Sequence, residues 1–200
     1  MRPVGQVHMK TLYFLRGLPA SGKTTWAKKK LAVMNKDGKR RAVRVNKDEI
    51  RVRLVAKGSA SEGKVIKRET ELVTKAMKSG LDVIIDNTHF NPIHEWQYRD
   101  LAEEYGYRFQ IVSFTDVSIN ECIRRDQKRR KWVGQDVIVR MDDYRGSLTR
   151  SVVADLKKQW TAKKVAAAKR LAAKEKPIVK KAAVGKAATK KMVGKAATIR

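Results

Sequence analysis

The sequence is poor in cysteine, in long apolar runs and in acidic residues, and each shortage excludes a class of protein. Cys122 is the only cysteine among 200 residues, so the chain can form neither an internal disulfide nor a cysteine-rich metal site. No stretch approaches the roughly 18 apolar residues of a membrane span, and the N-terminus lacks the apolar core of a signal peptide. These absences predict a soluble, cytoplasmic protein with no membrane partner.

The scarcity of acidic residues leaves a large positive charge. The chain has 47 Lys and Arg against 20 Asp and Glu, a formal net charge of +27. Residues 1–150 hold 32 basic and 18 acidic residues, and residues 151–200 hold 15 and 2. Both parts are basic, which favours a polyanionic partner such as nucleic acid. A general solubility or host bias is the alternative, because charge alone indicates non-specific binding.

The most informative segment that is present is residues 17–24, G-L-P-A-S-G-K-T, which fits the phosphate-binding pattern G-x-x-x-x-G-K-[ST]. The apolar run 12–15 predicts a strand that leads into it, and residues 25–34 predict a helix directly after it. The alternative is an ordinary glycine-rich turn before a helix. The strand, loop and helix context favours a P-loop that binds ATP or another nucleoside triphosphate.

The spacing of this motif suggests what each residue does. Gly17 and Gly22 let successive backbone amides point at one anion, at the positive end of the following helix. Lys23 can then reach the β- and γ-phosphates, and the Thr24 hydroxyl can bind Mg²⁺. The residues expected to contact the nucleotide here are Gly17, Pro19, Ala20, Ser21, Gly22, Lys23, Thr24 and Thr25.

Strands and helices alternate after the loop. Strands are predicted over residues 11–16, 42–45, 81–85 and 107–114, with helices over 25–34, 62–79 and 92–105 between them. This alternation indicates an α/β fold, a P-loop NTPase-type parallel sheet flanked by helices. We expect a flexible extension over 1–9, a P-loop kinase domain over 10–150 and a basic tail over 151–200. No sequence signal specifies an oligomeric state.

Polar residues follow the second and third strands, at the sheet edge where α/β proteins bind ligands. Asp48 is the candidate base that orients and deprotonates an acceptor hydroxyl, and Arg51, one helical turn later, could hold an anion on the acceptor. Asp48 could instead be a plain helix N-cap. Asp86 is the candidate second carboxylate, near the metal with Thr24, and Asn87 and Thr88 are its polar neighbours on the substrate side.

A basic segment over about 118–134 comes after the fourth strand and predicts a helical lid. Arg125 and Arg129 lie four residues apart and so would share one helix face of a lid that closes over the phosphates. The alternative is a solvated surface helix.

The tail from about residue 163 is rich in Lys and Ala. Residues 151–173 contain good helix formers, but the tail is poor in large apolar residues, so we expect a helix that frays into a disordered polycation. If it binds nucleic acid, it should do so through phosphates and without sequence preference.

Four motifs together resemble the kinase half of phage polynucleotide kinase-phosphatases and related zeta-toxin-like P-loop kinases, across about residues 10–145. They are G-L-P-A-S-G-K-T-T-W (17–26), N-K-D-E-I-R (46–51), I-I-D-N-T-H-F-N-P (84–92) and R-R-D-Q-K-R-R-K-W-V-G (124–134). The resemblance implies that Lys23 and Thr24 serve the donor phosphates and metal. It also implies that Asp48 is the base on a 5′-hydroxyl and that Arg51 binds the adjacent phosphate of the acceptor. Arg125 and Arg129 would hold the donor nucleotide and the transferred phosphate.

The chain departs from the phage pattern in three ways. The phage enzymes have Asp where this chain has Asn87, so either Asp86 or Asn87 could take that acidic position. No D-x-D-G-T phosphatase motif is present after the kinase motifs, so 3′-phosphatase activity is not expected. The basic tail has no counterpart in the matched motifs.

The sequence therefore predicts an ATP- and Mg²⁺-dependent polynucleotide 5′-hydroxyl kinase acting on DNA or RNA ends. Two alternatives stay open. One is a P-loop kinase of a small hydroxyl compound, similar to zeta-toxin, gluconate or adenylylsulfate kinases. The other is a nucleic-acid-binding protein with a nucleotide switch.

Overall fold

A computed structural model of the chain describes residues 9–193 apart from 57, 59 and 60. The expected N-terminal extension, Met9 excepted, lies outside the described residues, as does the end of the tail from 194. The chain divides into two units, Met1–Thr149 and Arg150–Arg200. This division falls next to the boundary expected at residue 150.

The first unit is built on four parallel strands in the order β2-β3-β1-β4. They are β1 (Thr11–Arg16), β2 (Ala42–Val45), β3 (Asp82–Ile85) and β4 (Arg108–Ser113). Phe14 of the central strand β1 pairs with Ile85 of β3 and with Ile111 of β4. The predicted parallel α/β sheet is confirmed, with each strand within two residues of its expected bounds.

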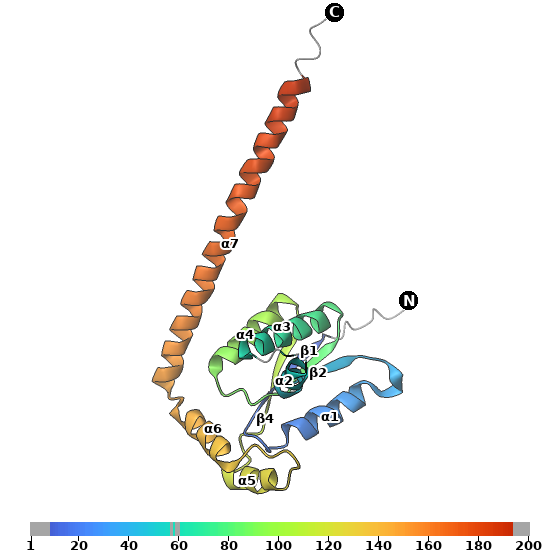
Figure 1. Ribbon diagram of the computed structural model, residues 1–200, viewed down its shortest axis with the longest axis vertical. Coiled ribbons are helices and arrows are strands. Elements are labelled where there is room, and N and C mark those ends of the chain that lie inside the picture. Colours follow the sequence, from blue (N-terminus) through green and yellow to red (C-terminus); the bar gives the residue numbers. More distant parts are fainter. Residues whose placement is uncertain (1–8, 57, 59–60, 194–200) are drawn as a thin grey trace, which may run out of the picture. The chain divides into compact units, whose positions relative to one another are not determined.

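Helices cover both faces of the sheet (Figure 1). Leu12 and Phe14 of β1 lie in the apolar core with residues of α3 (Glu62–Lys78) and α4 (Pro92–Glu104). Leu15 belongs to a second cluster with Ala27 of α1 (Lys23–Met34), against which Tyr13 packs. Because successive strand residues face opposite sides, an apolar β1 is the strand expected between two helical layers.

Polar caps at the sheet edge set where the helices begin. The Asn46 side chain accepts a hydrogen bond from the Glu49 amide, so α2 (Lys47–Val55) starts with only Asn46 between it and the end of β2. Asn91 caps α4 in the same manner, with Pro92 at its first position. A short 3₁₀ turn, η1 (Lys36–Gly38), connects α1 to β2.

The segment after β4 forms two helices, α5 (Ile119–Gln127), within the segment expected to form a helical lid, and α6 (Gln135–Ser147) after it. We call α5 and α6 with residues 128–134 between them the lid, and residues 128–134 the elbow. Leu18 of the P-loop packs with Cys122 of α5 and Ile138 of α6, and all three side chains are buried. The lid helices are thus joined to the P-loop by an apolar contact.

The second unit consists of α7 (Arg150–Val193). This helix continues past residue 173 through the part of the tail expected to fray. Ala and Lys are good helix formers, and they dominate the sequence along its length. Within the described residues, no helix is long and apolar enough to cross a membrane.

Candidate active site

A cleft with a volume of about 950 Å³ lies at the carboxyl ends of β1, β2 and β3. Its walls come from the P-loop, the start of α2, the segment after β3, and the lid. It contains most of the predicted site residues. The predicted residues that line it are Pro19, Ala20, Gly22, Lys23, Thr24, Thr25, Asp48, Arg51, Asp86, Asn87, Thr88, Arg125 and Arg129.

Gly17 and Ser21, also predicted to contact phosphate, lie beneath the cleft wall. The Gly17 amide donates to the carbonyl of Thr88 at 3.1 Å, which joins the P-loop to the segment after β3. A Cβ at Gly17 would lie 2.8 Å from Ser21 Oγ and 2.9 Å from Phe114 Cβ, so only glycine fits. Gly22, with φ 107°, has a backbone conformation that favours glycine, and it is the N-cap residue of α1.

Lys23 folds back onto the loop that carries it. Its Nζ donates to the carbonyls of Gly17 at 2.8 Å and Leu18 at 2.6 Å. Burial lowers the pKa of Lys23 from 10.5 to about 8, with Asp86 opposing this shift. The ammonium group therefore occupies the centre of the loop, ready to exchange two carbonyl partners for phosphate oxygens.

Thr24 and Asp86 form a pair of oxygen donors beside this lysine. The Thr24 hydroxyl donates to Asp86 Oδ1 at 3.3 Å, and Arg44 Nε donates to Asp86 Oδ2 at 2.7 Å. Asp86 is almost fully buried, and Arg44 balances its charge. Mg²⁺ prefers a few protein oxygens and completes its shell with phosphate oxygens and water. The pair fits such an ion, and the described residues contain no group of three or more acidic, His or Cys side chains that could hold a metal ion.

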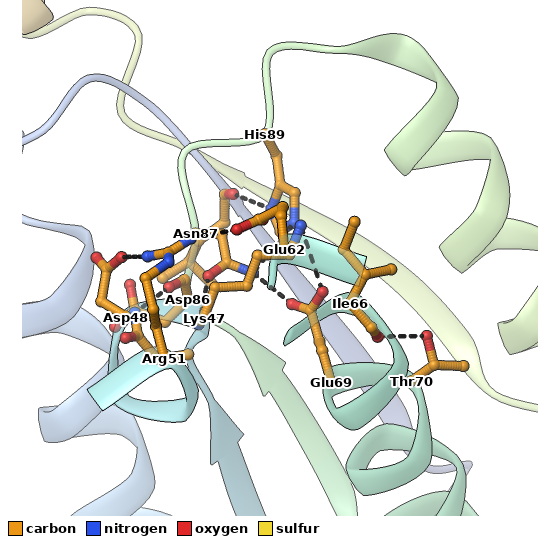
Figure 2. Close-up of polar contacts among 12 residues, drawn as sticks. Lys47, Asp48, Arg51, Glu62, Ile66, Glu69, Thr70, Asp86, Asn87 and His89 are labelled. Carbon is orange, nitrogen blue, oxygen red and sulfur yellow. Dashed lines mark hydrogen bonds and ion pairs between the residues drawn. The ribbon is translucent and has the colours of Figure 1, made fainter. Parts of the chain in front are cut away.

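Asp48 lines the cleft from the first turn of α2, and its side chain lies beside that of Arg51 (Figure 2). Because Asn46 is the cap of α2, the alternative that Asp48 is only an N-cap is wrong. The Asp48 side chain is 84% exposed, and its Oδ1 accepts from Arg51 Nη1 at 2.6 Å. Arg51 Nη2 also donates to Glu62 of α3 at 2.9 Å. A carboxylate and a guanidinium thus stand side by side where an acceptor could enter.

Asn87 takes a different place from Asp86, although the two are adjacent in sequence. Its Oδ1 accepts from the Lys47 amide at 3.0 Å, and its Nδ2 donates to Glu69 Oε1 at 2.6 Å. The acidic residue next to Thr24 is therefore Asp86, and Asn87 contacts the start of α2 instead.

The two predicted lid arginines both line the cleft, but they do not share a helix face. Helix α5 ends at Gln127, so Arg129 lies in the elbow. Asp126 turns the chain there, because it accepts from the amides of Val133 and Gly134 at 2.8 and 3.0 Å and from Arg129 Nη1 at 3.2 Å. Arg125 stays on α5, where its Nη1 donates to the Ser21 carbonyl at 3.4 Å.

Sequence reasoning missed several residues of the site. Lys47 and Glu62 line the cleft, while Arg44 and Glu69 lie behind it. Glu69 left a signal in the sequence: it interrupts an otherwise apolar row at four-residue spacing, between Val65 and Val73 of α3. A carboxylate in such a row is buried only when polar partners meet it.

The chain is similar to known proteins in sequence. A family model described as AAA domain matches residues 12–148. Over 136 residues the chain is 28% identical to a protein of Autographa californica nuclear polyhedrosis virus described as a bifunctional polynucleotide kinase/RNA ligase. That match covers 60% of this chain and 18% of the viral protein, so the chain spans less than a fifth of this relative.

The solved structures that match this chain include the following two. The Pnkp1/Rnl/Hen1 RNA repair complex includes a chain with a TM-score of 0.49 and 24% identity, where the match covers 80% of this chain and 48% of that one. The Mycobacterium tuberculosis APS kinase CysC, in complex with AMPPNP and APS, has a TM-score of 0.49 and 22% identity, covering 60% of this chain and 70% of that one.

Proposed function

The chain belongs to the family described as AAA domain, with a P-loop kinase-like fold, and from this membership we propose that it is an ATP-dependent polynucleotide 5′-hydroxyl kinase. It would transfer the γ-phosphate of ATP to the 5′-hydroxyl end of DNA or RNA. The observation that carries the proposal is that Lys23, Thr24 and Asp86 line the same cleft as Asp48 and Arg51.

The residues on the donor side suit a triphosphate. Lys23 and the loop amides bind the β- and γ-phosphates, while Arg125 and Arg129 approach from the lid. A magnesium ion held by Thr24 and Asp86 would neutralise charge on the phosphate oxygens. The lid arginines hold the transferred group as its charge spreads over the equatorial oxygens.

The residues on the acceptor side suit a hydroxyl next to a phosphate. Asp48 accepts the proton of the 5′-hydroxyl as the 5′-oxygen forms a bond to the γ-phosphorus. The bond from this phosphorus to the β–γ bridging oxygen breaks, and ADP leaves with that electron pair. Arg51 binds the phosphate that comes after the first nucleoside, after exchanging its ion pair with Glu62 for that anion.

Three features favour a polynucleotide over a small hydroxyl compound. The elbow has four successive basic residues, 128–131, and then Trp132, whose side chain is 70% exposed. Cations next to an exposed aromatic ring match the backbone charge and stacked bases of a single strand. The viral relative is described as acting on polynucleotides. The third feature is the basic tail, which can hold nucleic acid near the cleft and raise its local concentration.

The single cysteine of the sequence, Cys122, is buried and free, which is consistent with a protein that acts in the reducing cytoplasm.

The test is phosphate transfer from γ-labelled ATP to matched DNA and RNA oligonucleotides with 5′-hydroxyl ends. Label on these ends, and none on the same oligonucleotides with 5′-phosphates, would support the proposal. Label on a sugar or a small nucleotide alone would indicate a small-molecule kinase. Tight, salt-sensitive nucleic-acid binding with no labelled acceptor would indicate a binding protein with a nucleotide switch. Asp37→Asn, in the turn after α1 and outside the cleft, is a matched control for changes at Asp48.

A further inference from the structure

Helix α3 carries a buried carboxylate that the proposed reaction does not use. Glu69 is 2% exposed, between the apolar side chains of Val65 and Val73. A buried carboxylate is costly unless it is paired and hydrogen-bonded, and an apolar residue of similar volume is often no less stable at such a position. The partners of Glu69 therefore indicate what it does.

Two of its three partners, Asn87 and Lys47, line the cleft. Glu69 Oε1 accepts from Asn87 Nδ2 at 2.6 Å, and Glu69 Oε2 lies 3.5 Å from Lys47 Nζ (Figure 2). Tyr98 of α4 supplies the third hydrogen bond. Burial and the charge of Glu69 raise the pKa of Tyr98 well above its usual value, so its hydroxyl keeps the proton that it donates.

These contacts fix the orientation of the Asn87 amide. The Nδ2 group also lies 3.4 Å from His89 Nε2, and His89 Nδ1 lies 3.0 Å from the Leu15 carbonyl. Burial lowers the pKa of His89 well below its usual value, so the ring is neutral, and it donates to Leu15 and accepts from Asn87. Both hydrogens of the Asn87 amide are thus directed at Glu69 and His89, which leaves Asn87 Oδ1 facing the Lys47 amide.

The Lys47 amide is the first of helix α2 and belongs to the group of N-terminal amides that have no partner within the helix. We propose that Glu69 is a positioning residue for phosphoryl transfer: through Asn87 and Lys47 it fixes the first turn of α2 and thereby the location of Asp48. The role in transfer rests on the proposed kinase function. The effect on the Lys47 amide does not, and it can be measured separately.

The experiment compares Glu69→Gln and Glu69→Leu with the wild-type chain and with Glu71→Gln as a matched control. Glu71 lies on the same helix and pairs with Arg68 at the surface. Glu69→Leu removes the acceptor for Asn87. Glu69→Gln keeps an oxygen acceptor for Asn87 but loses the negative charge opposite Lys47. If Glu69→Leu fails to fold, Glu69→Gln takes its place in the comparison. Two kinds of measurement are made. One is hydrogen exchange of the Lys47 amide, and the other is the steady-state kinetics, with kcat and the KM values for ATP and for a 5′-hydroxyl oligonucleotide.

We expect Glu69→Leu to lower kcat by about 10- to 100-fold, because a misplaced base loses its alignment with the reacting oxygen. The KM for ATP should stay within about twofold of the wild type, since the P-loop is untouched. The kcat of Glu69→Gln should lie between those of Glu69→Leu and the wild type. Exchange of the Lys47 amide should become faster, while the interior of α3 stays protected. A wild-type kcat or an unchanged Lys47 amide would overturn the proposal. If the wild-type chain labels no oligonucleotide, the kinase proposal fails, and the exchange rate of the Lys47 amide alone decides on Glu69.

Discussion

ATP binding should weaken as the pH rises past about 8, because the pKa of Lys23 in the P-loop is lowered from 10.5 to about 8. Burial disfavours the charged form of this ammonium group. Bound phosphates supply the negative charge that restores it, so ATP binds best to the protonated form. Above pH 8, binding must therefore be accompanied by the uptake of a proton.

The size of the effect depends on the pKa of Lys23. At about pH 9 roughly one molecule in eleven keeps the Lys23 proton, so the apparent Kd for ATP should be about eightfold higher than at about pH 7.5, a loss of about 1.3 kcal/mol. The lowered pKa of Lys23 also makes the free energy of unfolding depend on pH. Between about pH 8 and pH 10.5 the unfolded chain binds the Lys23 proton and the folded chain does not, so the contribution of Lys23 to stability rises with pH across this window.

Calorimetric titration with ATP, in two buffers of different ionisation enthalpy, measures both the Kd and the number of protons taken up. Lys23→Met is the control: it should bind ATP weakly, with a Kd that does not change over this range. The wild-type chain should take up close to one proton per ATP at about pH 9. A Kd that stays constant from about pH 7.5 to about pH 9, with no proton uptake, would refute the account of Lys23.

Four further perturbations test other parts of the molecule. Asp48→Asn should lower transfer to an oligonucleotide by about 100-fold or more, with ATP affinity unchanged in the same preparation; strong residual transfer would remove Asp48 as the base. Arg44→Met should cost about 3 kcal/mol in the free energy of unfolding, measured with urea, because buried Asp86 loses its counter-charge; an unchanged midpoint would contradict this. Trp132→Ala should raise the KM for a single-stranded oligonucleotide by at least about fivefold, while Trp132→Phe should not; equal KM values would argue against stacking. Deleting residues 163–200 should weaken nucleic-acid affinity at low salt with kcat at saturating oligonucleotide retained; unchanged affinity would argue against a role of the tail in binding.

The sequence predicted the sheet well because its strands have strong local signals. The run that forms β1 is apolar at nearly every position, as a strand buried on both faces requires, and the P-loop motif predicts the loop and the helix after it. The end of α5 was harder to predict. Arg129 continues the basic pattern of Arg125, yet a tertiary contact decides the outcome: Asp126 accepts two elbow amides and ends the helix before Arg129.

The interior of the site was the least predictable part. Asp48 and Asp86 come soon after strands, so their place at the sheet edge could be inferred from the chain order. The hydrogen bond between Glu69 and Asn87 depends on where two segments distant in sequence meet. Neither segment contains a sequence signal that predicts contact with the other. Likewise, the sequence allowed Asp48 to be a cap, and only the contact between Asn46 and the Glu49 amide decided against it.

The apolar contact between Leu18, Cys122 and Ile138 limits how the enzyme can enclose its substrates. A rigid-body rotation of both lid helices would either expose the side chains of Leu18, Cys122 and Ile138 to water or displace the P-loop with the helices. Residues 128–134 lie outside this contact, so a conformational change there leaves it intact. Entry and exit at the cleft would then be controlled by one short basic turn that bears Arg129 and Trp132, while the helices on either side of it stay fixed.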